Sequence, residues 1–439
     1  EYLATNQGVV GSNPASRANN KKRINGSDAQ ASDPFSVSGL PIHRGAWQID
    51  ATRSPPMPNA VYIHSMSPAK TRIAAAQPAL VPLDSIKGRG SATAMPHRFE
   101  RQAREQYDDG WGSLEQTARE EHLPPATQVI EEHAKKIVSS NQSPDISFDY
   151  SVNPYRGCEH GCIYCFARPT HSYLNLSPGL DFETRIIAKV NAAERLRETL
   201  AGARYEPRSL VIGTATDAYQ PVERKLGLTR QVIEVLAEAR HPFSVVTKSS
   251  GIERDLDLIA PMAAQGLVAV YLSVTTLDND LSRILEPRAA APARRLRTIQ
   301  TLAEAGVPVG VSVSPIIPFI NEPELERILE AAAAAGASSA FSIPVRLPWE
   351  VNPLFQDWLQ RHFPARAERV MARIRDMRDG KDNDARFGTR MTGEGLWADL
   401  LRARLRRACA RLGLRTERRP VQLALFEPPR KSSAQASLF

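Results

Sequence analysis

The chain has 439 residues, a formal net charge of +8 and only four cysteines. This length allows one large domain or two, and so few cysteines exclude the disulfide framework of a small secreted protein. No apolar run is long enough to cross a bilayer, so we expect no membrane partner and a cytoplasmic location, where thiols stay reduced. The modest positive charge permits nucleic-acid binding without requiring it.

Residues 1–90 are rich in Pro, Ser, Ala, Asn and Gly, which predicts a disordered N-terminal extension. The chain begins with Glu1, and the run GSNP that ends at Pro14 is what the T-arm of a tRNA gene would encode. We therefore expect a misassigned start, with translation beginning at Met57 or Met66. Residues 91–137 are charged and show a helical pattern, which predicts a helical lead-in.

Residues 138–346 alternate strand and helix patterns. After a first strand just before the cysteines, apolar strands are predicted at 209–214, 243–248, 267–276, 307–315 and 338–345, and helices at about 183–201, 228–239, 253–264, 293–305 and 322–335. Short connections between them indicate parallel strands with right-handed crossovers. This α/β pattern favours a partial (β/α)6 TIM-type barrel, with a doubly wound open sheet as the alternative.

The C-terminal part predicts a helical extension over residues 347–415, covering the open side of the barrel, and a flexible tail over residues 416–439. An amphipathic pattern near the end of the extension carries arginines on one face. Arginines often only solvate a helix, but such a face also suits DNA or RNA.

Three of the four cysteines, Cys158, Cys162 and Cys165, are spaced C-x3-C-x2-C, with glycines before the first two. Such a loop can direct three thiolates at an iron–sulfur cubane and leave its fourth iron open to an exchangeable molecule. A structural zinc completed by His160 or His171 is one alternative, and inert buried thiols are another. Zinc sites usually take their cysteines in two separated pairs, and no second pair exists here.

Polar residues follow several predicted strands: Asp217, Lys248, Ser273, Thr275 and, in the run EPR, Arg288. Active sites of such barrels collect at the carboxyl ends of the strands, so we expect these side chains at one mouth. For any single one, a surface ion pair or a strand-end cap is the alternative.

The run NPYRGCEHGCIYCFARP, which ends at Pro169, resembles the signature of radical S-adenosylmethionine (SAM) enzymes. The whole run also resembles an uncharacterised bacterial branch related to spore photoproduct lyase, the DNA repair photolyase-like proteins. This resemblance extends over roughly residues 125–410 of the chain. The resemblance implies a 4Fe-4S cluster on Cys158, Cys162 and Cys165, as the catalytic and metal-binding residues, whose open iron binds SAM. It implies that an electron from the cluster cleaves SAM to methionine and a 5′-deoxyadenosyl radical, which abstracts hydrogen from a substrate. We also expect an external electron donor such as flavodoxin or ferredoxin.

Charge assigns the expected SAM contacts to five side chains: Asp217 at the ammonium, Lys248 at the carboxylate, Ser273 and Thr275 at the ribose or carboxylate edge, and Arg288 at a second anion site. The resemblance implies that Tyr164 occupies the aromatic position near the adenine. The substrate side is assigned to the stretch after the cysteines, through His171, Tyr173, Asp181 and Glu183, with ordinary turn chemistry as the alternative.

The sequence also departs from the photoproduct lyases, which use a cysteine near the second strand as hydrogen donor. No cysteine lies between Cys165 and Cys409, so thymine-dimer repair by that mechanism is not expected. Tyr173, Tyr219 or Tyr271 are candidates to relay a hydrogen atom instead.

The tail run QLALF, Gln422 to Phe426, resembles the pentapeptide with which bacterial DNA polymerases and repair enzymes bind the sliding clamp, and Gln435 to Phe439 is a looser copy. The leading interpretation is a radical SAM enzyme acting on nucleic acid in repair or modification. The alternatives are a radical SAM enzyme for a protein or small molecule, and a non-enzymatic zinc- or cluster-containing nucleic-acid-binding module.

Overall fold

A computed structural model describes residues 88–91, 95–100, 126–417 and 421–430. The expected start codon, nearly all of the N-terminal extension and the second copy of the tail motif lie outside these residues. No helix of the described part is long and apolar enough to span a membrane.

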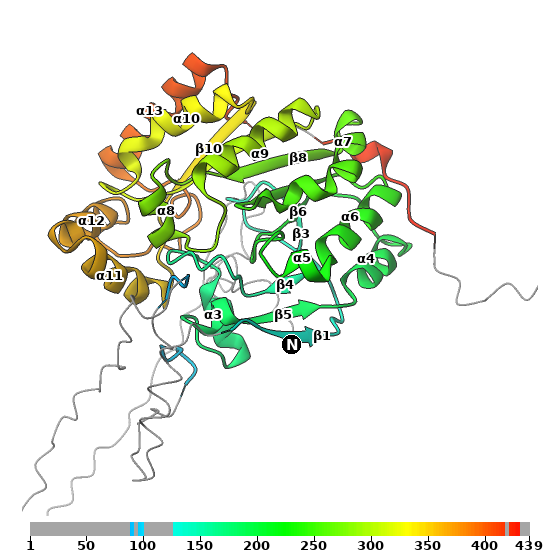
Figure 1. Cartoon of the computed structure of the whole chain (residues 1–439), viewed down its shortest axis with the longest axis horizontal. Helices are drawn as coiled ribbons and strands as arrows, with labels where there is room; N and C mark the ends of the chain where they lie inside the picture. The colour runs from blue at the N-terminus through cyan, green and yellow to red at the C-terminus, as the bar shows by residue number, and fades with distance from the viewer. Residues whose placement is uncertain (1–87, 92–94, 101–125, 418–420, 431–439) are drawn as a thin grey trace, which may run out of the picture. The chain divides into compact units, whose positions relative to one another are not determined.

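The central element is an open sheet that, within the described residues, has the strand order β10-β9-β8-β7-β6-β3-β2 (Figure 1). All neighbours from β3 to β10 are parallel, and β2 runs antiparallel to β3. The parallel strands follow one another in chain order, without the reversal of a doubly wound sheet, which confirms the partial barrel. The strands are β2 Val138–Ser140, β3 Tyr150–Val152, β6 Leu210–Ile212, β7 Phe243–Thr247, β8 Val268–Ser273, β9 Val309–Ile316 and β10 Ser339–Pro344.

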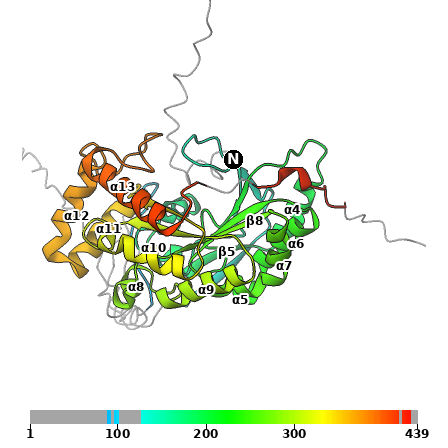
Figure 2. The same ribbon diagram turned by 90° about the horizontal axis from the view of Figure 1, so that it is seen from above.

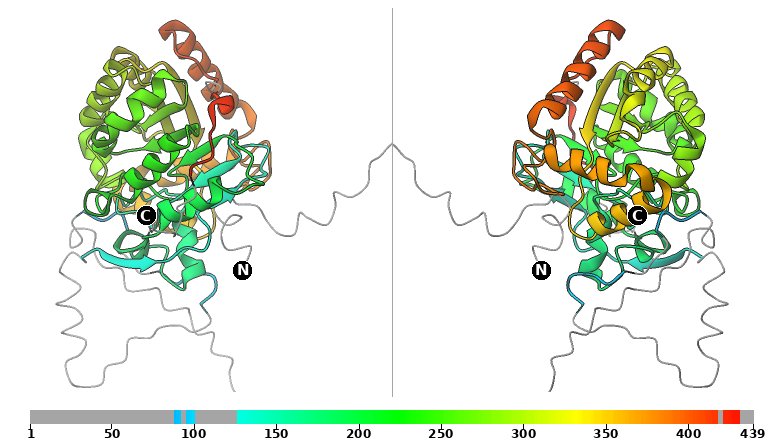
Figure 3. Two further views of the ribbon diagram at one scale, coloured as in Figure 1. Left: turned by 90° about the vertical axis from the view of Figure 1, so that its right-hand side faces the viewer. Right: turned by 90° about the vertical axis from the view of Figure 1, so that its left-hand side faces the viewer.

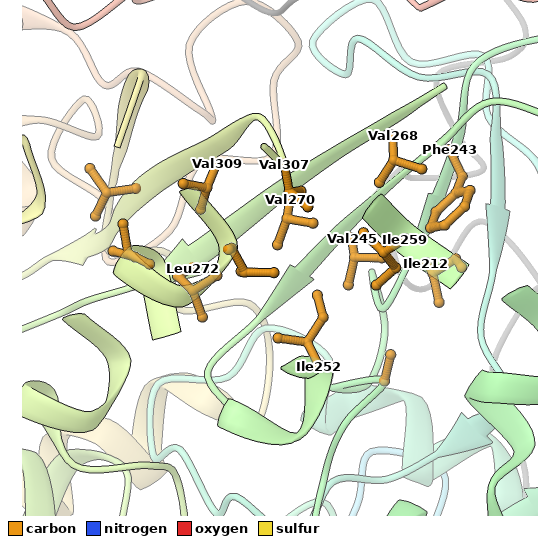
Figure 4. Close-up of a cluster of buried hydrophobic side chains, with 14 of the residues drawn as sticks. Ile212, Phe243, Val245, Ile252, Ile259, Val268, Val270, Leu272, Val307 and Val309 are labelled. Atoms are coloured by element: carbon orange, nitrogen blue, oxygen red, sulfur yellow. The ribbon is translucent and has the colours of Figure 1, made fainter. Parts of the chain in front are cut away.

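Helices cover the outer face of this sheet (Figure 2): α4 Ala192–Leu200, α6 Leu228–Glu238, α7 Leu256–Ala264, α9 Pro292–Glu304 and α10 Leu325–Ala334. In α10, buried residues recur at Leu325, Ile328, Leu329 and Ala332, the spacing that places them on one helical face. Alternate strand residues meet these helices in one hydrophobic core, part of which is drawn in Figure 4.

The remaining strand residues face the inside of the open barrel and are mostly small or polar, as at Ser244, Ser273 and Ser312. Tyr271 is the largest of them on β8, and its ring packs edge-on against Phe341 with centroids 5.4 Å apart. The sequence alternation thus separates an apolar outer face from an inner face suited to a polar ligand.

Two helical predictions are wrong in part. A small second sheet has the order β1-β5-β4, with β1 Gln128–Glu132, β4 Tyr155–Arg156 and β5 Arg185–Lys189. The strand β1 replaces the end of the expected helical lead-in, and β5 replaces the start of the helix expected at about 183–201. Ile186 and Ile187 are buried against partners more than 30 residues away, so local periodicity did not reveal the pairing.

The C-terminal extension is helical as expected, with α11 Val351–His362, α12 Pro364–Asp376 and α13 Gly395–Leu412. Helices α11 and α12 share a hydrophobic core with Ile163 and Tyr164 of the cysteine loop. Trp358 of α11 is almost fully buried, and its Nε1 donates to the carbonyl of Ile284 at 3.0 Å. This shared core supports the loop that carries the cysteines, and Figure 3 shows the helices of the extension, in orange to red, beside the barrel.

Short elements complete the described chain: η3 Arg168–Leu174, α3 Asp181–Thr184, α5 Glu223–Leu226, η4 Ser250–Asp255, α8 Asn279–Leu285, η5 Glu322–Glu324 and η6 Leu423–Leu425. The segment between α12 and α13 bridges the two sides of the open sheet. Arg390 pairs with Asp145, in the loop before β3, at 2.7 Å, while Arg378 donates to the carbonyl of Val345 after β10 at 3.0 Å.

Residues 421–430, expected within a flexible tail, pack against the barrel. Phe426 lies 5.6 Å from the ring of Tyr205 and 5.4 Å from that of His241, and the amide of Glu427 donates to the carbonyl of Ala239. The first copy of the tail motif therefore contacts its own domain in this structure.

Candidate active site

The cysteine loop curls at two glycines with left-handed backbone angles. Gly157 has φ +81°, and a Cβ there would lie 2.9 Å from the carbonyl oxygen of Phe182. Gly161 has φ +67°, and a Cβ there would lie 2.7 Å from the carboxylate of Glu183. Both positions demand glycine for conformation and for space, as the sequence pattern indicated.

A fully buried ion pair, Arg168–Glu183, holds this loop in place. The guanidinium of Arg168 contacts the Glu183 carboxylate at 2.5 Å and donates to the carbonyls of Cys162 and Gly161 at 2.9 and 3.1 Å. The same carboxylate accepts from the backbone amides of Gly90 and Ser91, both at 2.9 Å. Sequence reasoning assigned Glu183 to the substrate side and missed Arg168, although it follows the last cysteine by only three residues.

The other side of the loop rests on the segment after β6. Thr216 Oγ1 donates to the carbonyl of Gly157 at 2.6 Å, and the Gln220 side-chain amide oxygen accepts from the amide of Glu159 at 2.9 Å. The Glu159 carboxylate in turn accepts from the amide of Val222 at 2.6 Å. The loop is thus fixed to the barrel by backbone contacts on both sides.

The three thiols are enclosed. Cys158 and Cys162 are each 7% exposed and Cys165 is partly buried, and none forms a disulfide. Burial raises the pKa of all three, that of Cys162 to about 12, while the nearby charge of Lys248 opposes the rise at Cys162 and Cys165. Thiolates here therefore need a strongly cationic centre beside them, which bound iron provides.

No three His, Cys, Asp or Glu side chains of the described part lie close enough together to bind a single metal ion. A zinc site of Cys158, Cys162 and Cys165 with either histidine is such a compact set, whereas a cubane spreads its thiolates over three separate irons. His171 is also engaged elsewhere, since its Nε2 lies 3.0 Å from the carbonyl of Arg185. His171 is thus held by the protein through one ring nitrogen, while its buried Nδ1 has no hydrogen-bond partner in the described part of the chain.

Asp217 and Lys248 meet beside the thiols, as the strand-end pattern predicted. The Asp217 carboxylate accepts from Thr247 Oγ1 at 2.7 Å and from the Lys248 amide at 2.8 Å, and lies 3.3 Å from His160 Nδ1. Burial alone would raise the pKa of Asp217, but His160 and these hydrogen bonds outweigh it and lower the pKa. Because internal donors already occupy this carboxylate, it fixes the start of the loop after β7 in addition to any contact with a ligand.

The Lys248 side chain lies over the Tyr164 ring, with Nζ 5.9 Å from the ring centroid. Burial would lower the pKa of Lys248, but the charges of Cys162 and Glu286 raise it overall. The ammonium therefore stays charged next to the thiols, where a ligand carboxylate would find it.

Tyr164 and Ser273 belong to one buried network that sequence reasoning missed. The Tyr164 hydroxyl donates to Glu286, whose other oxygen contacts Arg295 at 2.5 Å. Arg295 also donates to the carbonyl of Ser273 at 3.0 Å. Glu286 is the first residue of the run EPR, of which sequence reasoning singled out only Arg288. In the structure, Glu286 connects Tyr164 of the cysteine loop to β8 through Arg295.

The last two predicted contacts differ in their surroundings. Thr275 is fully buried, and its Oγ1 has no hydrogen-bond partner in the described part of the chain. Such an orphaned hydroxyl at a strand end is a place where a ligand oxygen or nitrogen fits. Arg288 lies beside the cysteine loop and pairs with Glu159 at 3.2 Å, so its anion site is at least partly filled by the protein itself.

The proposed substrate-side and relay residues are dispersed. Asp181 accepts from the Ser177 amide, which is ordinary turn chemistry, and His171 is buried beneath the loop. Tyr219 is buried and bonds Asp255 at 3.0 Å, whereas Tyr173 is 42% exposed. Of the relay candidates, Tyr271 is the one on an inward-facing strand position.

Two buried histidines predict how stability depends on pH. Burial lowers the pKa of His171 and of His241 to about 4, below the value near 6.5 of the unfolded chain. Between these values the unfolded state binds more protons, so the free energy of unfolding should fall as the pH drops from about 6.5 to about 4. Urea denaturation across this range should show a weaker dependence for His241→Gln, while His133→Gln, an exposed control, should match the wild type. Equal slopes for all three proteins would contradict the assignment.

Comparison with known proteins agrees with this arrangement. Residues 152–332 match the family model of the radical SAM superfamily, whose enzymes use a 4Fe-4S cluster and SAM. An uncharacterised protein of Mycobacterium tuberculosis is 38% identical over 221 residues, which is 50% of this chain and 65%, just under two thirds, of the relative. An uncharacterised protein of Methanocaldococcus jannaschii is 26% identical over 197 residues, 45% of this chain and 71% of the relative.

Among solved structures, a mutant of spore photoproduct lyase superposes with a TM-score of 0.49 at 18% identity, over 66% of this chain and 81% of the other. The same enzyme complexed with dinucleoside spore photoproduct gives 0.48 at 17% identity, over 66% and 81% of the two chains. These likenesses are too distant to transfer an activity. Residues 152–332 of this chain are therefore similar to the radical SAM superfamily, and the cysteine loop lies within this matched segment.

Proposed function

We propose that this chain is an enzyme in which Cys158, Cys162 and Cys165 hold a 4Fe-4S cluster and SAM binds beside it at the barrel mouth. The observation that supports this most is a set of three enclosed thiols on a loop locked by Arg168 and Glu183. Anaerobic reconstitution with iron and sulfide tests it. We expect a brown protein with a reducible cubane, whereas a colourless protein that binds zinc and ignores SAM would support the nucleic-acid-binding module instead.

When bound, the cluster and SAM supply a 5′-deoxyadenosyl radical able to take a hydrogen atom from a substrate. The chain's own residues bind SAM and orient it. Lys248 holds the SAM carboxylate, the hydroxyls of Ser273 and Thr275 meet the ribose or carboxylate edge, and Tyr164 packs near the adenine. Asp217 places a negative charge near the ammonium while both of its carboxylate oxygens keep their internal donors, and Arg288 remains the second anion candidate.

Replacing Lys248 by Gln should weaken SAM binding about 10- to 100-fold, because a charge-assisted hydrogen bond contributes roughly 1.5–3 kcal/mol. Isothermal titration of SAM into reconstituted protein measures this loss. The matched control is Lys225→Gln on α5, an exposed lysine, which should bind SAM as the wild type does. Equal affinities of the Lys248 variant and the wild type would remove this lysine from the site.

We propose a nucleic acid as the substrate, in repair or modification, with a flavodoxin- or ferredoxin-type electron donor and a cytoplasmic location. A protein or small-molecule substrate is the second candidate, and the polar inner face of the barrel suits it equally well. Crosslinking the reconstituted protein to DNA and RNA separates the two, because a small-molecule enzyme should give no specific crosslink.

The sliding clamp remains a proposed partner of Gln422 to Phe426. Since Phe426 packs on Tyr205 and His241, the motif would have to leave its own domain to bind. A peptide of this sequence should therefore bind purified clamp more tightly than the full chain does. No binding of the peptide would end the proposal.

A further inference from the structure

Three large aromatic side chains lie exposed together near the cysteine loop. Phe99, Tyr173 and Trp349 are 49%, 42% and 44% exposed. All three surround the guanidinium of Arg98, whose carbon lies 4.7, 5.0 and 4.5 Å from their ring centroids. They come from separate segments, of which Tyr173 belongs to η3, directly after the cysteine loop, and Trp349 follows β10. We call these four residues the aromatic platform.

The platform is held rigidly rather than left loose. Arg98 Nη1 donates to both carboxylate oxygens of Glu350, at 2.9 and 2.7 Å, and the Arg98 backbone amide donates to the same carboxylate at 3.1 Å, which anchors the residue at two points. Glu350 also accepts from Ser172 Oγ, beside Tyr173, at 3.2 Å. Trp349 has φ +46°, a conformation that bulky residues rarely adopt, between the buried Leu347 and Val351. Exposed rings in a strained and fixed setting are typical of a binding surface.

A second feature lies three residues before Trp349. Arg346 follows β10 at the mouth, and its one polar contact within the described residues is from Nη1 to the Met391 sulfur at 3.2 Å. Its Nε is buried and has no hydrogen-bond partner among the residues that the structure describes. A thioether is a weak acceptor, so the guanidinium is left without an oxygen to bind.

The surroundings of Arg346 are positively charged. Burial, then Arg390 and Arg378, lower its pKa to about 10, and Asp145 and Asp384 only partly oppose this. Asp145 forms an ion pair with Arg390, and Asp384 forms one with Arg386. Arg378 donates hydrogen bonds to main-chain carbonyls, including that of Val345. The charge balance therefore leaves Arg346 as an anion site at neutral pH.

We propose that the aromatic platform and Arg346 together bind single-stranded nucleic acid across the barrel mouth, with a phosphate on Arg346 and a base stacked on the platform. Three residues of extended chain span about 10 Å, so both features lie within reach of one short strand. Proteins that bind single strands without sequence preference stack the bases on aromatic side chains and bind the phosphates with positively charged side chains. Because Glu350 neutralises Arg98, the platform supplies stacking and Arg346 supplies charge. The inference rests on the proposed function and deepens it by specifying a single strand and the place where it binds.

Fluorescence anisotropy with reconstituted full-length protein and a labelled 12-nucleotide oligothymidylate tests this, at several salt concentrations. Tyr173→Leu should weaken binding about tenfold with an unchanged salt slope, and Tyr173→Phe should restore it. Arg346→Gln should weaken binding and lower the salt slope by about 0.7, the value for one single-strand phosphate. Exposed control variants, Leu396→Ala and Arg283→Gln, should match the wild type.

The proposal is overturned if neither Tyr173→Leu nor Arg346→Gln changes binding. It is also overturned if duplex DNA binds as well as the single strand, or if inorganic polyphosphate of equal charge competes as strongly, since stacking would then be irrelevant. Competition by thymidine monophosphate as strong as that of the oligonucleotide would instead assign the site to free nucleotides. SAM cleavage without oligonucleotide is measured on the same samples, so a failure of the radical chemistry is distinguishable from a failure of strand binding.

Discussion

Replacing Cys162 by Ala should abolish the cluster and reduce 5′-deoxyadenosine formation to background. Two thiolates cannot hold a cubane that needs three, and Cys162 is enclosed in the core formed with α11 and α12, where no other ligand replaces it. Iron and sulfide content after anaerobic reconstitution, together with the yield of 5′-deoxyadenosine, measures the loss. Cys158→Ala and Cys165→Ala should behave alike.

The chain offers its own control for this experiment. Cys409 is free and 1% exposed, but it lies on α13, remote in sequence from the loop. Cys409→Ala should cost only about 1 kcal/mol of stability and leave iron content and SAM cleavage unchanged. If the Cys409 variant loses iron, or the Cys162 variant keeps it, the ligand assignment is wrong.

Replacing Arg168 by Met should destabilise the protein by roughly 3–5 kcal/mol, because it leaves the Glu183 carboxylate buried without its counter-charge. The cysteine loop should lose stability before the rest of the protein, since Arg168 also donates to the carbonyls of Cys162, Gly161 and Gly179. Urea denaturation measures the change in free energy, and hydrogen exchange over residues 157–166 shows whether the loop opens before the barrel. We expect cluster retention to fall with it.

A double variant separates charge from packing. Arg168→Met combined with Glu183→Gln removes the orphaned charge and keeps an acceptor for the amides of Gly90 and Ser91. It should recover part of the lost stability but not the contacts to the loop carbonyls, so the loop should still exchange faster than in the wild type. Identical behaviour of the single and double variants would show that the ion pair is not what holds the loop.

Much of the barrel was predictable because its strands are locally periodic. The segments 209–214 and 243–248 contain β6 and β7, and the segment 307–315 includes all of β9 except its last residue, Ile316. Each segment is an apolar run between clear turn signals. The small second sheet was not predictable, because β5 gains its partners from the segments of β1 and β4, and no local pattern carries that information. The same holds for the packed residues of the tail, whose apolar side chains looked free.

The candidate site likewise has residues that the sequence could predict and residues that it could not. The cysteine spacing and the strand-end positions of Asp217 and Lys248 are visible along the chain, and the structure brings them together. Arg168, Glu286 and Arg295 escaped notice because a buried arginine or glutamate looks, in sequence, like any surface charge. Only the fold reveals that Arg295 reaches both Glu286 and the Ser273 carbonyl.

The central claim is that three cysteines leave one iron of a cubane open for SAM. Electron paramagnetic resonance of the reconstituted, reduced protein tests it most directly, with and without SAM. We expect a 4Fe-4S signal whose g values shift when SAM is added, because SAM would bind beside the cluster that Cys158, Cys162 and Cys165 would hold. A cubane signal that SAM leaves unchanged, or a protein that acquires no cubane, would contradict it.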